Sequence, residues 1–160
     1  MSEHAAVSKL KEKFSASILE VTEFRGDMSV VVKKEDIVAV CEFLKGEQGY
    51  DFLTDLCGID NLGQAPRFMM VYQLYSIKAK DRLRIKAPVE DSDCRVDTVS
   101  GVWATANWLE RECWDMMGIT FNNHPDLRRI LMPEDFEGHP LRKDFPVQGL
   151  DREPYQGRVS

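Results

Sequence analysis

Acidic and basic side chains are concentrated in one stretch of the sequence, Glu110-Arg111-Glu112, with Asp115 three positions further on. If this stretch is helical, Glu112 and Asp115 share one face, and Arg111 reaches Asp115 at the next turn. Two neighbouring carboxylates can act as an acid and a base or bind a metal ion. More often such residues form a solvated face or ion pairs against another segment, and we favour this interpretation.

Three histidines, His4, His124 and His139, are the other candidates for acid–base chemistry. None lies four positions from another, so the sequence lacks the helical zinc motif of metalloproteases. His124 and His139 each precede a proline, which favours extended backbone and a role in orienting a turn. A free-standing acid/base or metal enzyme that uses Glu112, Asp115 and His124 stays open as an alternative.

Four cysteines are separated by 16, 37 and 19 positions, which is not the short spacing that presents two thiolates to one zinc ion or iron–sulfur cluster. The sequence also contains no phosphate-binding glycine loop and no dinucleotide fingerprint. Cys41 and Cys113 fall on apolar faces of predicted helices, so we expect both side chains to be buried. The sequence therefore predicts no cofactor and no metal in this chain.

Hydrophobic spacing predicts the helices and strands that hold these residues. The predicted helices span 3–15, 37–46 and 102–117, the last with Ser100 or Thr105 as a cap and Gly118 at its end. The predicted strands span 17–24, 28–33, 51–59, 67–77 and 82–87. Strands and helices do not alternate regularly in this order. This irregular order of elements therefore predicts an α+β fold with a mostly antiparallel sheet packed with helices.

Residues 122–160 differ in composition from the rest of the chain. They hold five of the seven prolines, and only 11 of these 39 residues are hydrophobic, against 43% of the whole sequence. Such a segment has too few apolar groups for its own core and too many for a solvated linker. We predict an α+β domain over 1–121 and an extended proline-rich C-terminal tail over 122–160. Composition alone leaves open whether the tail lies on its own domain or on a partner.

The charge balance limits the partners of the chain. Its 27 acidic and 21 basic residues give a net charge of −6, which argues against binding to nucleic acid and against attachment to anionic lipid by charge alone. No apolar run reaches the roughly 18 residues of a spanning helix, and residues 1–15 lack the apolar core of a secretory signal. We expect a cytosolic protein with no direct membrane span, held by another chain if it works at a membrane.

The stretch from Trp108 to Pro146 resembles a known family. Its matching parts are Glu110-Arg111-Glu112, Asp115, Gly118-Ile119, His124-Pro125, Leu127 through Leu131, Pro133-Glu134-Asp135 and Gly138 through Phe145. These parts are similar to the characteristic segment of the thirty-kilodalton-type subunit of NADH–quinone oxidoreductase (respiratory complex I). The match is long and ordered, and it covers about a quarter of the chain.

The resemblance implies a non-redox scaffold subunit in the peripheral arm of a proton-translocating complex, on the cytoplasmic face of the cell membrane. FMN and iron–sulfur clusters belong to partner subunits, and this chain supports the quinone-site subunit, over which its tail runs. The residues that the resemblance assigns to partner docking are Glu110, Arg111, Glu112, Asp115, His124, Arg128, Arg129, Glu134, Asp135, Arg142, Lys143, Asp144 and Phe145.

Two further alternatives remain at this point. Related subunits occur in membrane-bound hydrogenases and in ferredoxin-type quinone reductases, and the shared segment does not distinguish these complexes because other subunits choose the electron donor. A binding module outside any redox complex is the second alternative.

Overall fold

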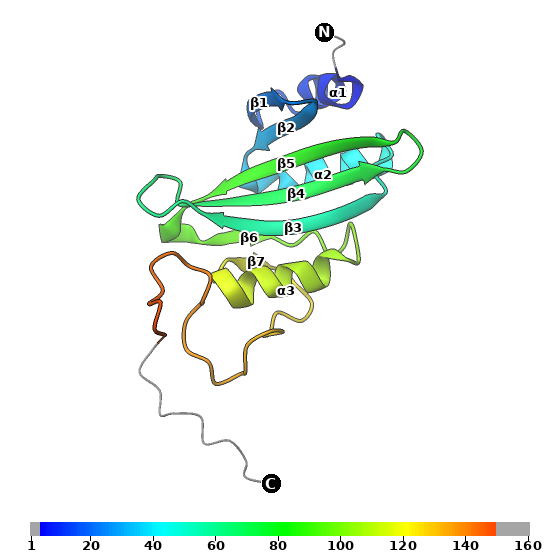
Figure 1. The fold of residues 1–160 in the computed structure, drawn as a ribbon. Coiled ribbons are helices and arrows are strands. Elements are labelled where there is room, and N and C mark those ends of the chain that lie inside the picture. Colours follow the sequence, from blue (N-terminus) through cyan, green and yellow to red (C-terminus); the bar gives the residue numbers. More distant parts are fainter. Residues whose placement is uncertain (1–3, 150–160) are drawn as a thin grey trace.

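The computed structural model describes residues 4–149, which form three α-helices and seven β-strands (Figure 1). The helices are α1 (Ala5–Lys13), α2 (Ile37–Gly46) and α3 (Ala106–Met117). The strands are β1 (Ile18–Phe24), β2 (Asp27–Val32), β3 (Phe52–Asp60), β4 (Phe68–Ser76), β5 (Asp81–Val89), β6 (Arg95–Asp97) and β7 (Thr120–Asn122). Every predicted helix and strand is present, whereas β6 and β7 were not predicted.

Five strands form one sheet in the order β1-β2-β5-β4-β3, and β6 pairs with β7 in a second, two-stranded sheet. Three of the four pairings in the large sheet are antiparallel. The fourth is parallel and joins β2 to β5, with Ser29 opposite Arg84. The pairing of β6 with β7 is also parallel. The structure thus confirms the α+β class and a mostly antiparallel sheet, and shows that the sheet is mixed.

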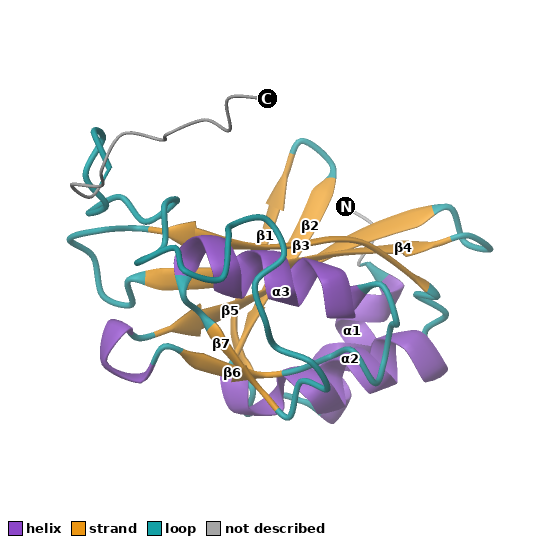
Figure 2. Ribbon diagram, turned by 90° about the horizontal axis from the view of Figure 1, so that it is seen from below, coloured by secondary structure: helices purple, strands orange, loops and turns teal. Residues whose placement is uncertain are grey.

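The two faces of the large sheet have different environments. Along β5, Leu83 and Ile85 are buried, while Arg82, Arg84 and Lys86 point to the opposite face, as alternation along a strand requires. Helix α2 lies behind the sheet in Figure 1, and in Figure 2 α1 and α2 lie together on the side of the sheet opposite the tip of the β1–β2 hairpin. No helix of the described residues covers the face that carries the two arginines, which we call the open face.

Helix α3 packs unusually closely against β3 because Gly58 lies between them. A Cβ atom at Gly58 would come within 2.9 Å of the Ile119 and Met117 side chains and 3.1 Å of the Cys113 sulfur. The helix ends at Gly118, which adopts the left-handed conformation (φ 75°), as predicted. It begins at residue 106 rather than 102, and the side chain of the predicted cap Thr105 makes no capping hydrogen bond.

The core confirms the predicted burial of Cys41 and Cys113, which are 0% and 5% exposed. Burial raises the pKa of both thiols. The part of the predicted tail beyond residue 149 lies outside the described residues. None of the helices in the described part of the chain has the length and apolar character that crossing a membrane requires.

Candidate functional site

The carboxylate of Asp115, on the third turn of α3, holds the segment that follows β7. This side chain is completely buried, and its Oδ2 accepts backbone N–H bonds from Ile130 (3.0 Å), Leu131 (2.8 Å) and Met132 (2.9 Å). Its Oδ1 accepts a charged hydrogen bond from Arg129. Burial alone would raise the pKa of Asp115, but these four donors outweigh it and hold the pKa below its ordinary value. Asp115 is thus an anionic anchor for residues 129–132.

Two arginines extend this anchor. Arg111, which the sequence spacing places within reach of Asp115, instead donates to the carbonyl oxygens of Arg128 (3.2 Å) and Arg129 (3.1 Å). Arg129 also donates to the carbonyl oxygens of Phe136 and Gly138, so its guanidinium joins α3 to two parts of the following loop. The favoured interpretation of this charged group was a solvated face or ion pairs against another segment, and Asp115 forms such an ion pair with Arg129.

The same segment then caps the C-terminal end of α3. Three backbone carbonyl oxygens in the last turn of the helix accept hydrogen bonds from this segment. The Asp115 oxygen accepts from the His139 ring (3.0 Å), the Met116 oxygen from the Leu141 backbone N–H (3.0 Å), and the Met117 oxygen from the Arg142 Nε (2.7 Å). A cationic guanidinium at this position also interacts favourably with the helix dipole. The C-terminal segment therefore supplies hydrogen-bond donors to carbonyl groups that the end of a helix otherwise leaves unpaired.

Arg67, directly before β4, forms a second anchor. Its guanidinium, almost fully buried, pairs with Asp60 (2.9 Å), Asp144 (2.8 Å) and Asp91 (3.1 Å). Asp60 also accepts the backbone N–H of Lys143 at 2.9 Å. Hydrogen bonds from Arg67 lower the pKa of Asp60 and Asp144. One guanidinium thus connects β3, the turn before β6 and the C-terminal segment, and the sequence contained no signal for this role.

Glu110 and His124 form a buried pair beneath the loop that follows β6. The Glu110 carboxylate accepts the Val99 N–H at 2.7 Å and the Thr98 hydroxyl. Both side chains are 0% exposed, and His124 Nε2 lies 3.8 Å from a Glu110 oxygen. Burial raises the pKa of Glu110 to about 7. Both predicted docking residues therefore lie inside the protein.

The ring nitrogens of His124 are both occupied. Nδ1 accepts the Asp126 N–H at 3.0 Å, and Nε2 lies 3.1 Å from the carbonyl oxygen of Asn107, to which only an N–H can donate. This arrangement fixes the neutral tautomer with its proton on Nε2.

The other predicted docking residues lie nearer to solvent. Arg128 forms an exposed ion pair with Asp126, and Phe145 stacks on Phe136 with ring centres 6.0 Å apart. The exposed members of the set are Glu112, Arg128, Glu134, Asp135, Lys143 and Asp144. The structure therefore places some residues of the set in contacts that shape the segment and others at the surface, while the exposed Asp144 also pairs with Arg67.

The geometry gives little support to acid–base or metal chemistry at Glu112, Asp115 and His124. Glu112 is exposed, Asp115 is saturated by four donors, and within the described residues no hydrogen bond or ion pair joins any two of the three. Across residues 4–149, no group of three or more His, Cys, Asp or Glu side chains could hold a metal ion.

Comparisons with known proteins give one consistent result. Residues 30–151 match a family model described as "Respiratory-chain NADH dehydrogenase, 30 Kd subunit". A protein of Geotalea uraniireducens that is named as a subunit of NADH-quinone oxidoreductase is 66% identical over 155 residues, which cover 97% of this chain and 94% of that protein. A protein of Rhizobium meliloti with the same kind of name is 50% identical over 138 residues, or 85% of this chain and 75% of that protein.

Two solved structures share the fold. The trypsin-resistant fragment (1-134) of Nqo5 is 31% identical with a TM-score of 0.68, covering 76% of this chain and 99% of the fragment. A chain of the membrane-bound sulfane sulfur reductase, an archaeal respiratory membrane complex, has a TM-score of 0.76 and covers 96% of this chain and 95% of its own length. At 20% identity, this second likeness shows the fold alone.

Proposed function

The chain belongs to the 30 kDa subunit family of respiratory-chain NADH dehydrogenase, and on this premise we propose that it is a scaffold subunit of the peripheral arm of a proton-translocating NADH–quinone oxidoreductase. In this role the chain holds no redox group, and FMN and iron–sulfur clusters lie in partner subunits. It supports the quinone-site subunit on the cytoplasmic face of the cell membrane while electrons pass from NADH to quinone.

The observation that supports this proposal is the surface built around α3. The Asp115 and Arg67 anchors fix the C-terminal segment, yet large apolar side chains on and beside α3 stay in solvent: Trp108, Leu131 and Leu141 are 63%, 58% and 59% exposed. Because the backbone beneath them is already ordered, binding through these side chains costs little conformational entropy. Exposed apolar groups on an ordered surface are typical of a protein–protein interface.

Charged residues border these apolar groups. Glu112 and Leu141 line a small hollow of about 80 Å³ between β3 and α3, together with the exposed Cys57. Glu134 and Lys143 are exposed on the anchored segment. Exposed charges around an apolar centre steer association and fix the register of a partner, while the apolar contacts supply most of the affinity. We therefore assign partner docking to this surface and a shaping role to the buried Glu110 and Asp115.

Assembly of the complex tests the proposal. The double change Leu131→Asp and Leu141→Asp places charges on the docking surface and keeps the side chains of Asp115 and Arg67 and the backbone N–H groups that bond to Asp115 and Met116. Ile77→Asp is the matched control, because Ile77 is 61% exposed in the turn between β4 and β5. We expect the double variant to fold, as judged by circular dichroism, but to lose co-purification with the other peripheral-arm subunits, and membrane NADH–quinone reductase activity to fall with it. The control should assemble normally.

Two results would contradict the proposal. One is assembly of the double variant at the level of the control. The other is flavin, iron or zinc bound at stoichiometric levels in the purified full-length chain, which would place redox or metal chemistry in this subunit.

A further inference from the structure

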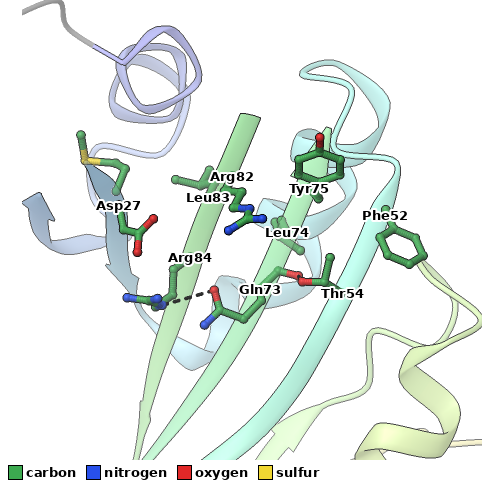
Figure 3. Close-up of a pocket in the computed structure, with 10 residues that line it drawn as sticks. Asp27, Phe52, Thr54, Gln73, Leu74, Tyr75, Arg82, Leu83 and Arg84 are labelled. Atoms are coloured by element: carbon green, nitrogen blue, oxygen red, sulfur yellow. Dashed lines mark hydrogen bonds between the residues drawn. The ribbon is translucent and has the colours of Figure 1, made fainter. Parts of the chain in front are cut away.

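A hollow of about 410 Å³ lies on the open face of the sheet, at the place where β2 and β5 diverge. Its lining side chains come from β2, β3, β4 and β5, and Figure 3 shows Arg82 and Arg84 on β5, Gln73 and Tyr75 on β4, and Phe52 on β3. None of the residues that line this hollow takes part in the contacts that anchor the C-terminal segment.

The two guanidiniums in the hollow have no acidic partner among the described residues. Arg84 donates to the side-chain oxygens of Gln73 and Ser29, both at 3.3 Å and both neutral. Arg82 is exposed, and its guanidinium makes no hydrogen bond or ion pair within residues 4–149. Asp27 also lines the hollow, but it forms no ion pair with either arginine in this part of the chain. The lining thus carries two arginines against one aspartate, a local excess of positive charge in a chain with a net charge of −6.

The spacing of the arginines indicates the shape of the ligand. Arg82 and Arg84 are two positions apart on one strand, so their side chains share a face and repeat at about 7 Å. Alternate side chains of an extended peptide repeat at the same distance. A guanidinium also matches a carboxylate with two parallel hydrogen bonds. Phe52, 46% exposed, and Tyr75 add aromatic surface beside the charges.

From this geometry we propose that the hollow binds an acidic, extended segment of a partner protein, whose carboxylates at alternate positions pair with Arg82 and Arg84. The segment lies across the open face, and its apolar side chains contact Phe52 and Tyr75. The inference is independent of the proposed scaffold role, because it concerns a different face of the protein from the surface around α3.

Nuclear magnetic resonance of the isotope-labelled full-length chain tests this site. The probe is a five-residue capped peptide in which glutamate alternates with valine, compared with its glutamine analogue and with inorganic phosphate. We expect the glutamate peptide to shift the side-chain signals of Arg82 and Arg84 and the backbone signals of Gln73 and Tyr75. Losing one charged, bidentate contact should weaken binding about tenfold in Arg82→Gln. Lys86→Gln, a charge change further along the same face of β5, should leave the affinity unchanged.

Three outcomes would overturn the inference: equal binding of the glutamine analogue, equal binding to wild type and Arg82→Gln, or the same shifts at the same concentration of phosphate. The last would show a simple anion site with no preference for a peptide. Arg82→Lys serves as a second variant, since it keeps the charge but not the planar fork, and it should bind more weakly than wild type and more tightly than Arg82→Gln.

Discussion

Replacing Asp115 with Asn should release the C-terminal segment from α3 while leaving the helix in place. The amide oxygen of Asn can still accept from the backbone of Ile130 to Met132, but its NH₂ group faces the guanidinium of Arg129, where a charged acceptor stood. Two donors then oppose each other in a site that is 0% exposed. The change therefore removes the ion pair and leaves Arg129, whose side chain is 13% exposed, without its counter-charge.

The expected loss of stability follows from this burial. Breaking a buried, hydrogen-bonded ion pair by removing one partner costs about 3–5 kcal/mol of unfolding free energy. The contribution of Asp115 is present above the ordinary carboxyl pKa and is lost as the pH falls through its lowered pKa. Wild type should therefore lose stability on acidification below about pH 4, and Asp115→Asn should lose less of it.

Urea unfolding and hydrogen exchange measure the two parts of this prediction. The control is Glu112→Gln on the same helix, which removes an exposed carboxylate and should change stability by less than about 0.5 kcal/mol. In Asp115→Asn, protection of the Leu131 and Met132 amides should fall about a hundredfold or more. Unfolding of Asp115→Asn at the same urea concentration as the control, or unchanged protection of these amides, would show that Asp115 does not hold the segment.

Three further changes test other contacts. Folding raises the pKa of Glu110 from 4.5 to about 7, so wild type loses stability as the pH rises between these values. Because Gln does not ionise, the unfolding free energy of Glu110→Gln should rise by about 3 kcal/mol relative to wild type across this window. Urea titrations that give the same difference between variant and wild type at about pH 4 and about pH 8 would contradict this prediction. Gly118→Ala places a Cβ atom 2.5 Å from the His139 ring at a residue with positive φ, and should lower the unfolding free energy by about 2 kcal/mol or more. An unchanged thermal midpoint would show that the His139 ring moves aside without cost. Arg67→Gln removes the cation that holds Asp144, so amide hydrogen exchange should become faster in the segment around Asp144. Unchanged hydrogen exchange in that segment would show that other contacts anchor it.

The helices and longer strands were predictable because their periodicity is local. Residues 37–46 carry apolar side chains at helical spacing, and the observed α2 has the predicted bounds. Charged and apolar residues alternate over 82–87, and the observed β5 buries every second side chain, as a half-buried strand does. Strands β6 and β7 have three residues each, too short to show any period. The parallel pairing of Ser29 with Arg84 joins residues far apart in the chain, and no local pattern encodes it.

The site was only partly predictable for a related reason. Charge spacing indicated a solvated face or ion pairs for the group around Asp115, and it did not identify the partners of Asp115, which are Arg129 and backbone N–H groups 15 to 17 positions further on. Backbone donors carry no side-chain signature, so sequence patterns cannot show them. Glu112 and Asp115 are three positions apart, yet one is exposed and the other buried, because the returning segment covers only one of them.

The parallel contact between β2 and β5 has a consequence for biosynthesis. Strands β3, β4 and β5 are neighbours both in the chain and in the sheet, so they can form a meander from contacts that are close in sequence. The β1–β2 hairpin leaves the ribosome first, but its only neighbour in the large sheet is β5, on the far side of that meander. The parallel pairing of β2 with β5 can therefore form only after every other strand of the large sheet has been synthesised.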